Sequence, residues 1–144
     1  MSEGYVVGQE PVIGVIGHRS WIAGRLMAEF TDPIVCLKGD VPNAADYSTL
    51  DCLYLFAGRS KGSSDDMRAE LDLVARLILV DRSFWPRRLV YVSSREAVDS
   101  TSNYGRGKRC CELRLSERFG DVLRVVRPGA VFGPGQPIDS PMLV

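Results

Sequence analysis

Residues 11–17 read PVIGVIG, and residues 20–30 shortly after them read SWIAGRLMAEF. The first run is apolar, rich in β-branched residues and closed by glycine, which is typical of a strand buried on both faces. In the second run the large apolar residues recur at helical spacing, and Ser20 can cap the helix. A buried strand that passes through glycine into an amphipathic helix predicts the opening unit of an α/β domain.

The same alternation continues along the chain. Apolar runs bounded by glycine, proline or polar residues predict four more strands, and two more stretches have the spacing of amphipathic helices. The predicted strands are residues 33–37, 52–58, 87–94 and 121–129, and the predicted helices are residues 63–82 and 104–119. Strands that are apolar throughout need cover on both faces, so we expect a doubly wound parallel sheet of the Rossmann-like type.

Composition narrows the class of protein. The 144 residues suffice for one domain, which we expect to span residues 1–144, and 45% of them are hydrophobic. Formal net charge is zero, so no global field attracts nucleic acid or an anionic membrane. No apolar run approaches the roughly 18 residues of a membrane span, and no secretory signal opens the chain. Four cysteines without a C-x-x-C pair predict reduced thiols, no metal site and a cytoplasmic location.

The turn after the first strand is a candidate dinucleotide site. Such a turn uses glycines so that backbone amides at a helix N-terminus approach a pyrophosphate. Gly17 fits the first glycine position, whereas the small residues Ser20 and Ala23 stand where the next two would be. We therefore take Gly17, Ser20, Trp21 and Ile22 as cofactor-binding candidates. A strand-to-helix turn without any ligand is the alternative interpretation.

Lys38 follows the second predicted strand, about where dinucleotide folds carry an acidic residue that binds the adenosine ribose. A lysine cannot accept a hydrogen bond from a ribose hydroxyl, but it can pair with a 2′-phosphate. Lys38 therefore favours NADP over NAD as the cofactor. The alternative is an ordinary solvated lysine in a loop.

Tyr104 and Lys108 stand one helical turn apart in the stretch NYGRGKRCCE (103–112). An ammonium beside a phenol stabilises the phenolate, so we expect Lys108 to lower the pKa of Tyr104. The tyrosine could then exchange a proton with a substrate hydroxyl while hydride passes to or from a nicotinamide. Ser93 and Ser94 end the preceding strand, where a hydroxyl could hold the substrate oxygen. An accidental match on an amphipathic helix is the alternative.

Five stretches of the chain resemble the extended short-chain dehydrogenase/reductases, the NAD(P)-dependent sugar-nucleotide epimerase and dehydratase family, and they occur in the family's order. They are VIGVIGHRSWIAGRL, LDCLYLFAG, LVYVSS, YGRGKRCCE and LRVVRPGAVFGPGQ. The resemblance implies Tyr104 as proton donor or acceptor and Lys108 as its modulator and a ribose contact. It implies Ser94, in preference to Ser93, as the partner of the substrate oxygen. It also implies cofactor contacts at the ends of the third and fifth strands, namely Ala57, Gly58, Pro128 and Gly129.

The chain also departs from the family pattern. Residues 38–51 leave room for a loop but not for the usual helix and strand, so we expect the sheet to be shortened by one α/β unit. We also expect the family's C-terminal substrate domain to be missing, because the chain is a fragment, a minimal member of the family, or a member that completes its pocket with a partner. The resemblance implies an oxidoreductase acting on a nucleotide sugar and a possible homodimer that pairs through helices. The alternative is a non-catalytic module of the same fold that binds a nucleotide or a protein.

Overall fold

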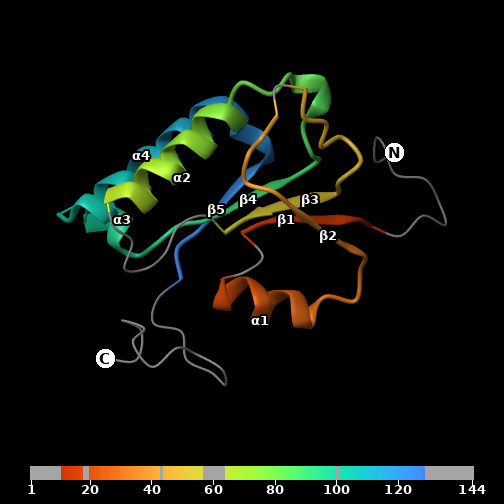
Figure 1. Cartoon of the computed structure of the whole chain (residues 1–144), viewed down its shortest axis with the longest axis horizontal. Coiled ribbons are helices and arrows are strands. Elements are labelled where there is room, and N and C mark those ends of the chain that lie inside the picture. The colour runs from red at the N-terminus through yellow and green to blue at the C-terminus, as the bar shows by residue number, and fades with distance from the viewer. Residues whose placement is uncertain (1–10, 18–19, 43, 57–63, 100, 129–144) are drawn as a thin grey trace.

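The computed structural model describes residues 11–17, 20–42, 44–56, 64–99 and 101–128. Its centre is a five-stranded sheet in which all neighbouring strands are parallel, in the order β2-β1-β3-β4-β5 (Figure 1). The strands are β1 (Ile13–Ile16), β2 (Ile34–Leu37), β3 (Cys52–Leu55), β4 (Leu89–Val92) and β5 (Leu123–Val126). Each lies inside a stretch that the sequence predicted as a strand, and the doubly wound parallel sheet is confirmed.

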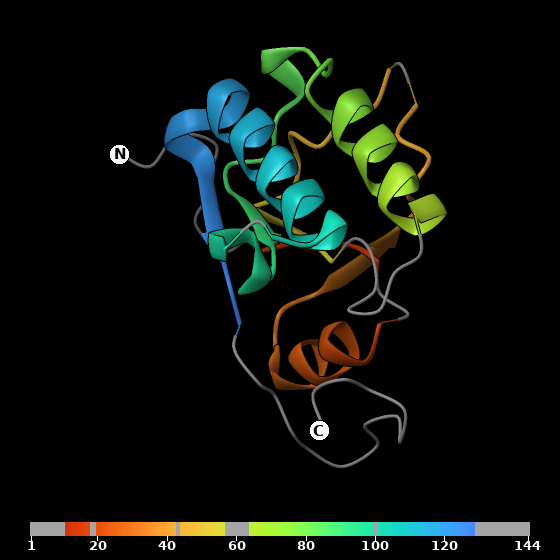
Figure 2. The same ribbon diagram turned by 90° about the vertical axis from the view of Figure 1, so that its left-hand side faces the viewer.

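Helices cover both faces of the sheet. Helix α1 (Trp21–Glu29) lies on one face, and α2 (Ser64–Leu77) and α4 (Asn103–Phe119) lie side by side on the other (Figures 1 and 2). The sequence placed these three helices correctly, although α2 ends at Leu77, five residues earlier than predicted. The short helix α3 (Glu96–Asp99) and the 3-10 turns η1 (Arg82–Phe84) and η2 (Gly120–Val122) were not predicted.

The core is divided by the sheet into two layers. The larger layer packs α2 and α4 on the sheet and includes Leu53, Leu55 and Leu89 from the strands, all without exposed surface. The smaller layer lies under α1, where Val15 on β1 and Ala23 on α1 are fully buried. A strand such as β1, with all four of its residues buried, requires both layers, which explains its continuous apolar sequence.

Residues 38–51 connect β2 to β3 without a helix or strand among the positions that the structure describes there. This connection is nevertheless part of the core, because Val41, Ala45, Tyr47 and Leu50 are buried in the larger layer. The expected shortening by one α/β unit is therefore present, and apolar side chains of the loop occupy the space beside α2.

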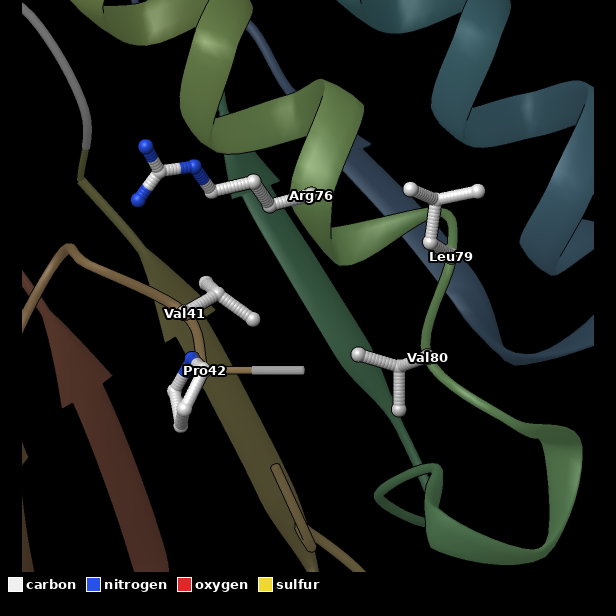
Figure 3. Close-up of a pocket in the computed structure, with 5 residues that line it drawn as sticks. All are labelled: Val41, Pro42, Arg76, Leu79 and Val80. Atoms are coloured by element: carbon white, nitrogen blue, oxygen red, sulfur yellow. The ribbon is translucent and has the colours of Figure 1, made fainter. Parts of the chain in front are cut away.

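A shallow cavity of about 250 Å³ lies between this loop and the C-terminal end of α2 (Figure 3). It is lined by Val41, Pro42, Arg76, Leu79 and Val80. In Figure 3 the loop residues face the side chains of Leu79 and Val80 across it. The cavity adjoins the end of α2 that is farther from the carboxyl ends of the strands, so it is separate from the edge where ligands of such sheets bind.

No helix within the described ranges has both the length and the apolar character needed to cross a membrane. In the same part of the chain, no three His, Cys, Asp or Glu side chains are grouped as metal ligands would be.

Candidate functional site

The strand order places a topological switch point at the carboxyl ends of β1 and β3. The chain leaves β1 for α1 on one face of the sheet, whereas the next helix after β3, α2, lies on the opposite face (Figure 1). Helices that depart to opposite faces leave a crevice between adjacent strand ends, and this is where open α/β sheets bind ligands.

Gly17 forms the turn at the first of these strand ends. Its φ of 89° lies in the left-handed region that side chains disfavour, and a Cβ atom there would lie only 1.9 Å from the carbonyl oxygen of Phe56. The turn after β1 therefore passes against the end of β3 at a distance that only glycine permits. This close approach explains the glycine by the protein's own packing, with or without a ligand.

Helix α1 begins directly beyond this turn. The Ser20 hydroxyl caps the helix by accepting a hydrogen bond from the backbone amide of Ala23 at 3.1 Å. Trp21 and Ile22 are the first two helical residues, whose amides have no acceptor within a helix. Ala23 is fully buried against the sheet, so its methyl group fills the space where a third glycine would allow closer packing. This helix N-terminus at the switch point fits the pyrophosphate of a dinucleotide.

The other predicted cofactor contacts are only partly described. Lys38 is exposed and follows directly on β2, as the sequence predicted, and Pro128 is half-buried beyond β5. Ala57, Gly58 and Gly129 lie outside the described residues. The structure thus places Gly17, Ser20, Trp21 and Ile22 together at one strand end, and Lys38 at the end of the neighbouring strand.

Tyr104 and Ser94 lie together beyond the carboxyl end of β4. Tyr104 is in the first turn of α4, and its hydroxyl lies close enough to the Ser94 side chain for that side chain to influence its pKa. The Ser94 hydroxyl accepts a hydrogen bond from the backbone amide of Glu96 at 3.2 Å. Ser93 is buried, whereas Ser94 is half-buried. Of the two serines that the sequence offered, Ser94 is therefore the one beside Tyr104.

The pKa of Tyr104 is shifted in the direction opposite to the one expected from its pairing with Lys108. The pKa of Tyr104 is raised from 10.0 to about 12, first because the phenol is buried and second because the carboxylate of Glu70 is near it. The neighbouring Ser94 hydroxyl acts in the opposite direction but does not outweigh them. The structure therefore keeps Tyr104 as a neutral phenol at physiological pH, where the Tyr-Lys spacing alone suggested an easily formed phenolate.

Lys108 itself is 2% exposed and lies between α2, α4 and the sheet. Its ammonium donates a hydrogen bond to Oε2 of Glu70 at 2.8 Å, and this carboxylate is also buried. The same oxygen accepts a hydrogen bond from the hydroxyl of Tyr91 on β4. The ammonium also lies 5.6 Å from the ring centroid of Tyr104, so the two residues of the pair are neighbours as predicted.

Glu70 is the residue of this site that the sequence analysis missed. It lies on α2 at positions i+3 from Met67 and i−4 from Val74, inside the apolar stripe of the helix. An acidic residue at such a position is almost never buried without a charged partner. Its place in the stripe was the available indication that a buried cation lies opposite.

Two glycines within the Tyr-x-x-x-Lys stretch allow this packing. A Cβ atom on Gly105 would lie 2.5 Å from the carbonyl oxygen of Glu96, so Gly105 lets α4 contact the backbone of α3. A Cβ atom on Gly107 would overlap the thioether of Met67, so Gly107 lets α4 approach α2. The sequence YGRGK therefore has a structural function as well, because it brings Lys108 within reach of Glu70.

Comparisons with known proteins bear on the fold. The sequence matches no protein-family model and no curated protein. Among solved structures, the capsular polysaccharide assembling protein CapF from Staphylococcus aureus superposes with a TM-score of 0.55 at 20% identity, over 84% of this chain and 36% of CapF. The aureusimine biosynthetic cluster reductase domain superposes with a TM-score of 0.60 at 16% identity, over 88% of this chain and 50% of that domain's chain.

At these identities the likeness establishes the Rossmann-like fold. The chain spans half or less of the length of either protein, so it corresponds to one part of each.

Proposed function

We propose that this protein binds NAD(P) across the carboxyl ends of β1 and β3 and is an oxidoreductase of the short-chain dehydrogenase/reductase type. The observation that carries the proposal is the placement of a neutral Tyr104, with Ser94 beside it, at the same edge of the sheet as the helix N-terminus after Gly17. Fold likeness to a reductase domain and to a polysaccharide assembly protein supports it.

Each residue would have a distinct role. The amides at the start of α1 would bind the pyrophosphate, and Lys38 would pair with a 2′-phosphate, which favours NADP. The nicotinamide supplies or accepts hydride when the cofactor is bound. Ser94 would orient the substrate oxygen, and Tyr104 would exchange a proton with it. We propose a nucleotide sugar as the substrate, supplied with its remaining binding residues by chain beyond the described part or by a second copy.

A second candidate function is a non-catalytic module that binds a nucleotide or a protein. The buried Lys108–Glu70 pair favours it, because Glu70 gives the Lys108 ammonium a partner within the protein and no cofactor is needed for that. A Tyr104→Phe variant separates the two candidates, since it should abolish turnover by the enzyme while it leaves nucleotide binding intact.

The test of cofactor binding is a titration of the purified chain with NADPH and NADH, in the wild type and in Lys38→Asp. The wild type should bind NADPH more tightly, and the variant should lose this preference by about tenfold or more, because a carboxylate repels the 2′-phosphate. Arg88→Asp, which changes an exposed cation just before β4 by the same two charges, is the control. Equal affinity for both nucleotides in every protein would remove the proposed role of Lys38, and no binding at all would remove the oxidoreductase proposal.

A further inference from the structure

Glu70 is buried in the larger core layer, whereas Asp72, the other acidic residue of α2 whose burial the structure describes, is exposed. Its Oε2 atom accepts hydrogen bonds from Lys108 at 2.8 Å and from Tyr91, while Oε1 has no hydrogen-bond partner. A buried carboxylate with one oxygen unsatisfied is costly, and a core could replace the ion pair with apolar side chains at little loss of stability. Stability alone therefore does not explain why this buried ion pair is present.

The surroundings of Glu70 show which groups respond to its charge. Within the described part of the chain, the titratable groups that face it are Lys108, Tyr104 and Cys111 from α4 and Tyr91 from β4. Tyr91, Tyr104 and Cys111 become anions when they lose a proton, and the negative charge of Glu70 contributes to raising the pKa of each. Burial is the larger cause in each case, and Glu70 acts in the same direction.

The position of Glu70 also determines where the charge of Lys108 is neutralised. An ammonium and a carboxylate 2.8 Å apart form a nearly neutral pair when seen from a third group several ångströms away. The Tyr104 ring centroid lies 5.6 Å from the ammonium. Glu70 therefore offsets the stabilisation of a Tyr104 phenolate that Lys108 would provide alone.

We propose that Glu70 is a positioning residue that binds Lys108 in the α2–α4 interface and favours the protonated form of the Tyr104 hydroxyl, so that the site donates a proton to a substrate carbonyl. This inference rests on the proposed function and adds a direction to it, namely carbonyl reduction. A bound NAD(P)H would supply the hydride for the new C–H bond and be oxidised to NAD(P)⁺. Tyr104 would give its proton to the carbonyl oxygen as the π bond breaks, so that an alcohol results, and the Tyr104 phenolate would regain a proton from water.

The test is a measurement of the Tyr104 titration in the free protein, which needs neither cofactor nor substrate. Tyrosine labelled with ¹³C at Cζ reports its own ionisation by NMR, and Tyr104→Phe identifies the Tyr104 resonance by its loss. In Glu70→Gln, which keeps the size of the side chain, the titration midpoint should fall by about one pH unit, a tenfold change in proton affinity. In Glu117→Gln, which removes an exposed carboxylate on α4, it should not move.

Two further measurements test the same inference if Glu70→Gln does not fold. Glu70→Asp keeps the charge and should retain the raised midpoint of Tyr104, which a purely packing role of Glu70 would not require. In the wild type, the Tyr104 resonance should shift in acid with the same midpoint as the carboxyl carbon of Glu70. A Tyr104 midpoint that is unchanged in Glu70→Gln, or a Tyr104 resonance indifferent to Glu70 protonation, overturns the inference.

The outcome is separable from that of the proposed function. A lower Tyr104 midpoint in Glu70→Gln, in a chain that binds neither NADPH nor NADH, would support the control of Tyr104 by Glu70 and contradict the oxidoreductase proposal. Binding of NADPH together with an unchanged Tyr104 midpoint in Glu70→Gln would support the oxidoreductase proposal and contradict the control of Tyr104 by Glu70.

Discussion

Gly17 is the single residue on which the turn at the switch point depends most directly. Gly17→Ala would combine a left-handed φ of 89° with a Cβ atom 1.9 Å from the Phe56 carbonyl oxygen, and backbone atoms cannot yield as a side chain does. We expect a loss of about 2–4 kcal/mol in the free energy of unfolding, measured by denaturant titration. Gly24→Ala is the matched control, because no atom lies within 4 Å of its added Cβ. This control should stabilise α1 by about 0.5–1 kcal/mol, and equal effects of the two variants would contradict the role of Gly17.

The candidate site was predictable at residue scale only in part. The spacing of Tyr104 and Lys108 and the serine before them place three side chains correctly, because helical periodicity and strand order fix their positions. The spacing carries no information about Glu70, which comes from a helix more than thirty residues earlier in the sequence. The sequence therefore located the phenol of Tyr104 correctly. It gave the wrong sign for the shift of its pKa, because it did not reveal the burial of the phenol or the nearby charge of Glu70.

At the scale of elements, Glu112 joins α4 to the chain that leaves β5. This carboxylate is 3% exposed, and its Oε2 accepts a hydrogen bond from Nε of Arg127 at 2.9 Å while Oε1 accepts from a second guanidinium nitrogen. Burial opposes ionisation of Glu112, but the hydrogen bonds and charge of Arg127 and the hydrogen bond of Arg109 outweigh it and hold its pKa below the ordinary value of 4.5.

Glu112→Gln should therefore reduce the free energy of unfolding by about 1–3 kcal/mol at neutral pH. Because the folded pKa is depressed, the contribution of the carboxylate is complete above 4.5 and is lost as pH falls through the folded value. The difference between wild type and variant should accordingly shrink in acid, which denaturant titrations at several pH values would measure. Glu117→Gln on the exposed face of α4 should change stability by less than about 0.5 kcal/mol at every pH. A gap between wild type and Glu112→Gln that is constant with pH would contradict the ion pair.

For the whole molecule, the order of strands and helices followed from the sequence because the central strands β1, β3 and β4 are covered on both faces and each long helix is buried on one. The path of residues 38–51 could not be predicted from the sequence, because their apolar residues have neither strand nor helical spacing. Their burial is created by tertiary packing, in which Leu50 lies against Gly14 of β1 and its carbonyl accepts a hydrogen bond from the amide of Arg87. A loop that contacts β1 and the segment just before β4 in this way belongs to the same folding unit as the sheet.

Leu50→Ala tests this dependence of the sheet on the loop. The Leu50 side chain is 5% exposed, and the Cδ1 atom would lie only 2.5 Å from a Cβ atom on Gly14, so its removal leaves a cavity against β1. We expect a loss of about 2–4 kcal/mol in the free energy of unfolding. Circular dichroism of the helices and tryptophan fluorescence should give one shared transition, because a two-state domain unfolds as a unit. Leu79→Ala, which truncates a side chain that is 81% exposed, should change stability by less than about 0.5 kcal/mol. If Leu50→Ala were as mild as Leu79→Ala, residues 38–51 would be an appendage to the sheet, and the space of the missing α/β unit would not be occupied by a part of the core.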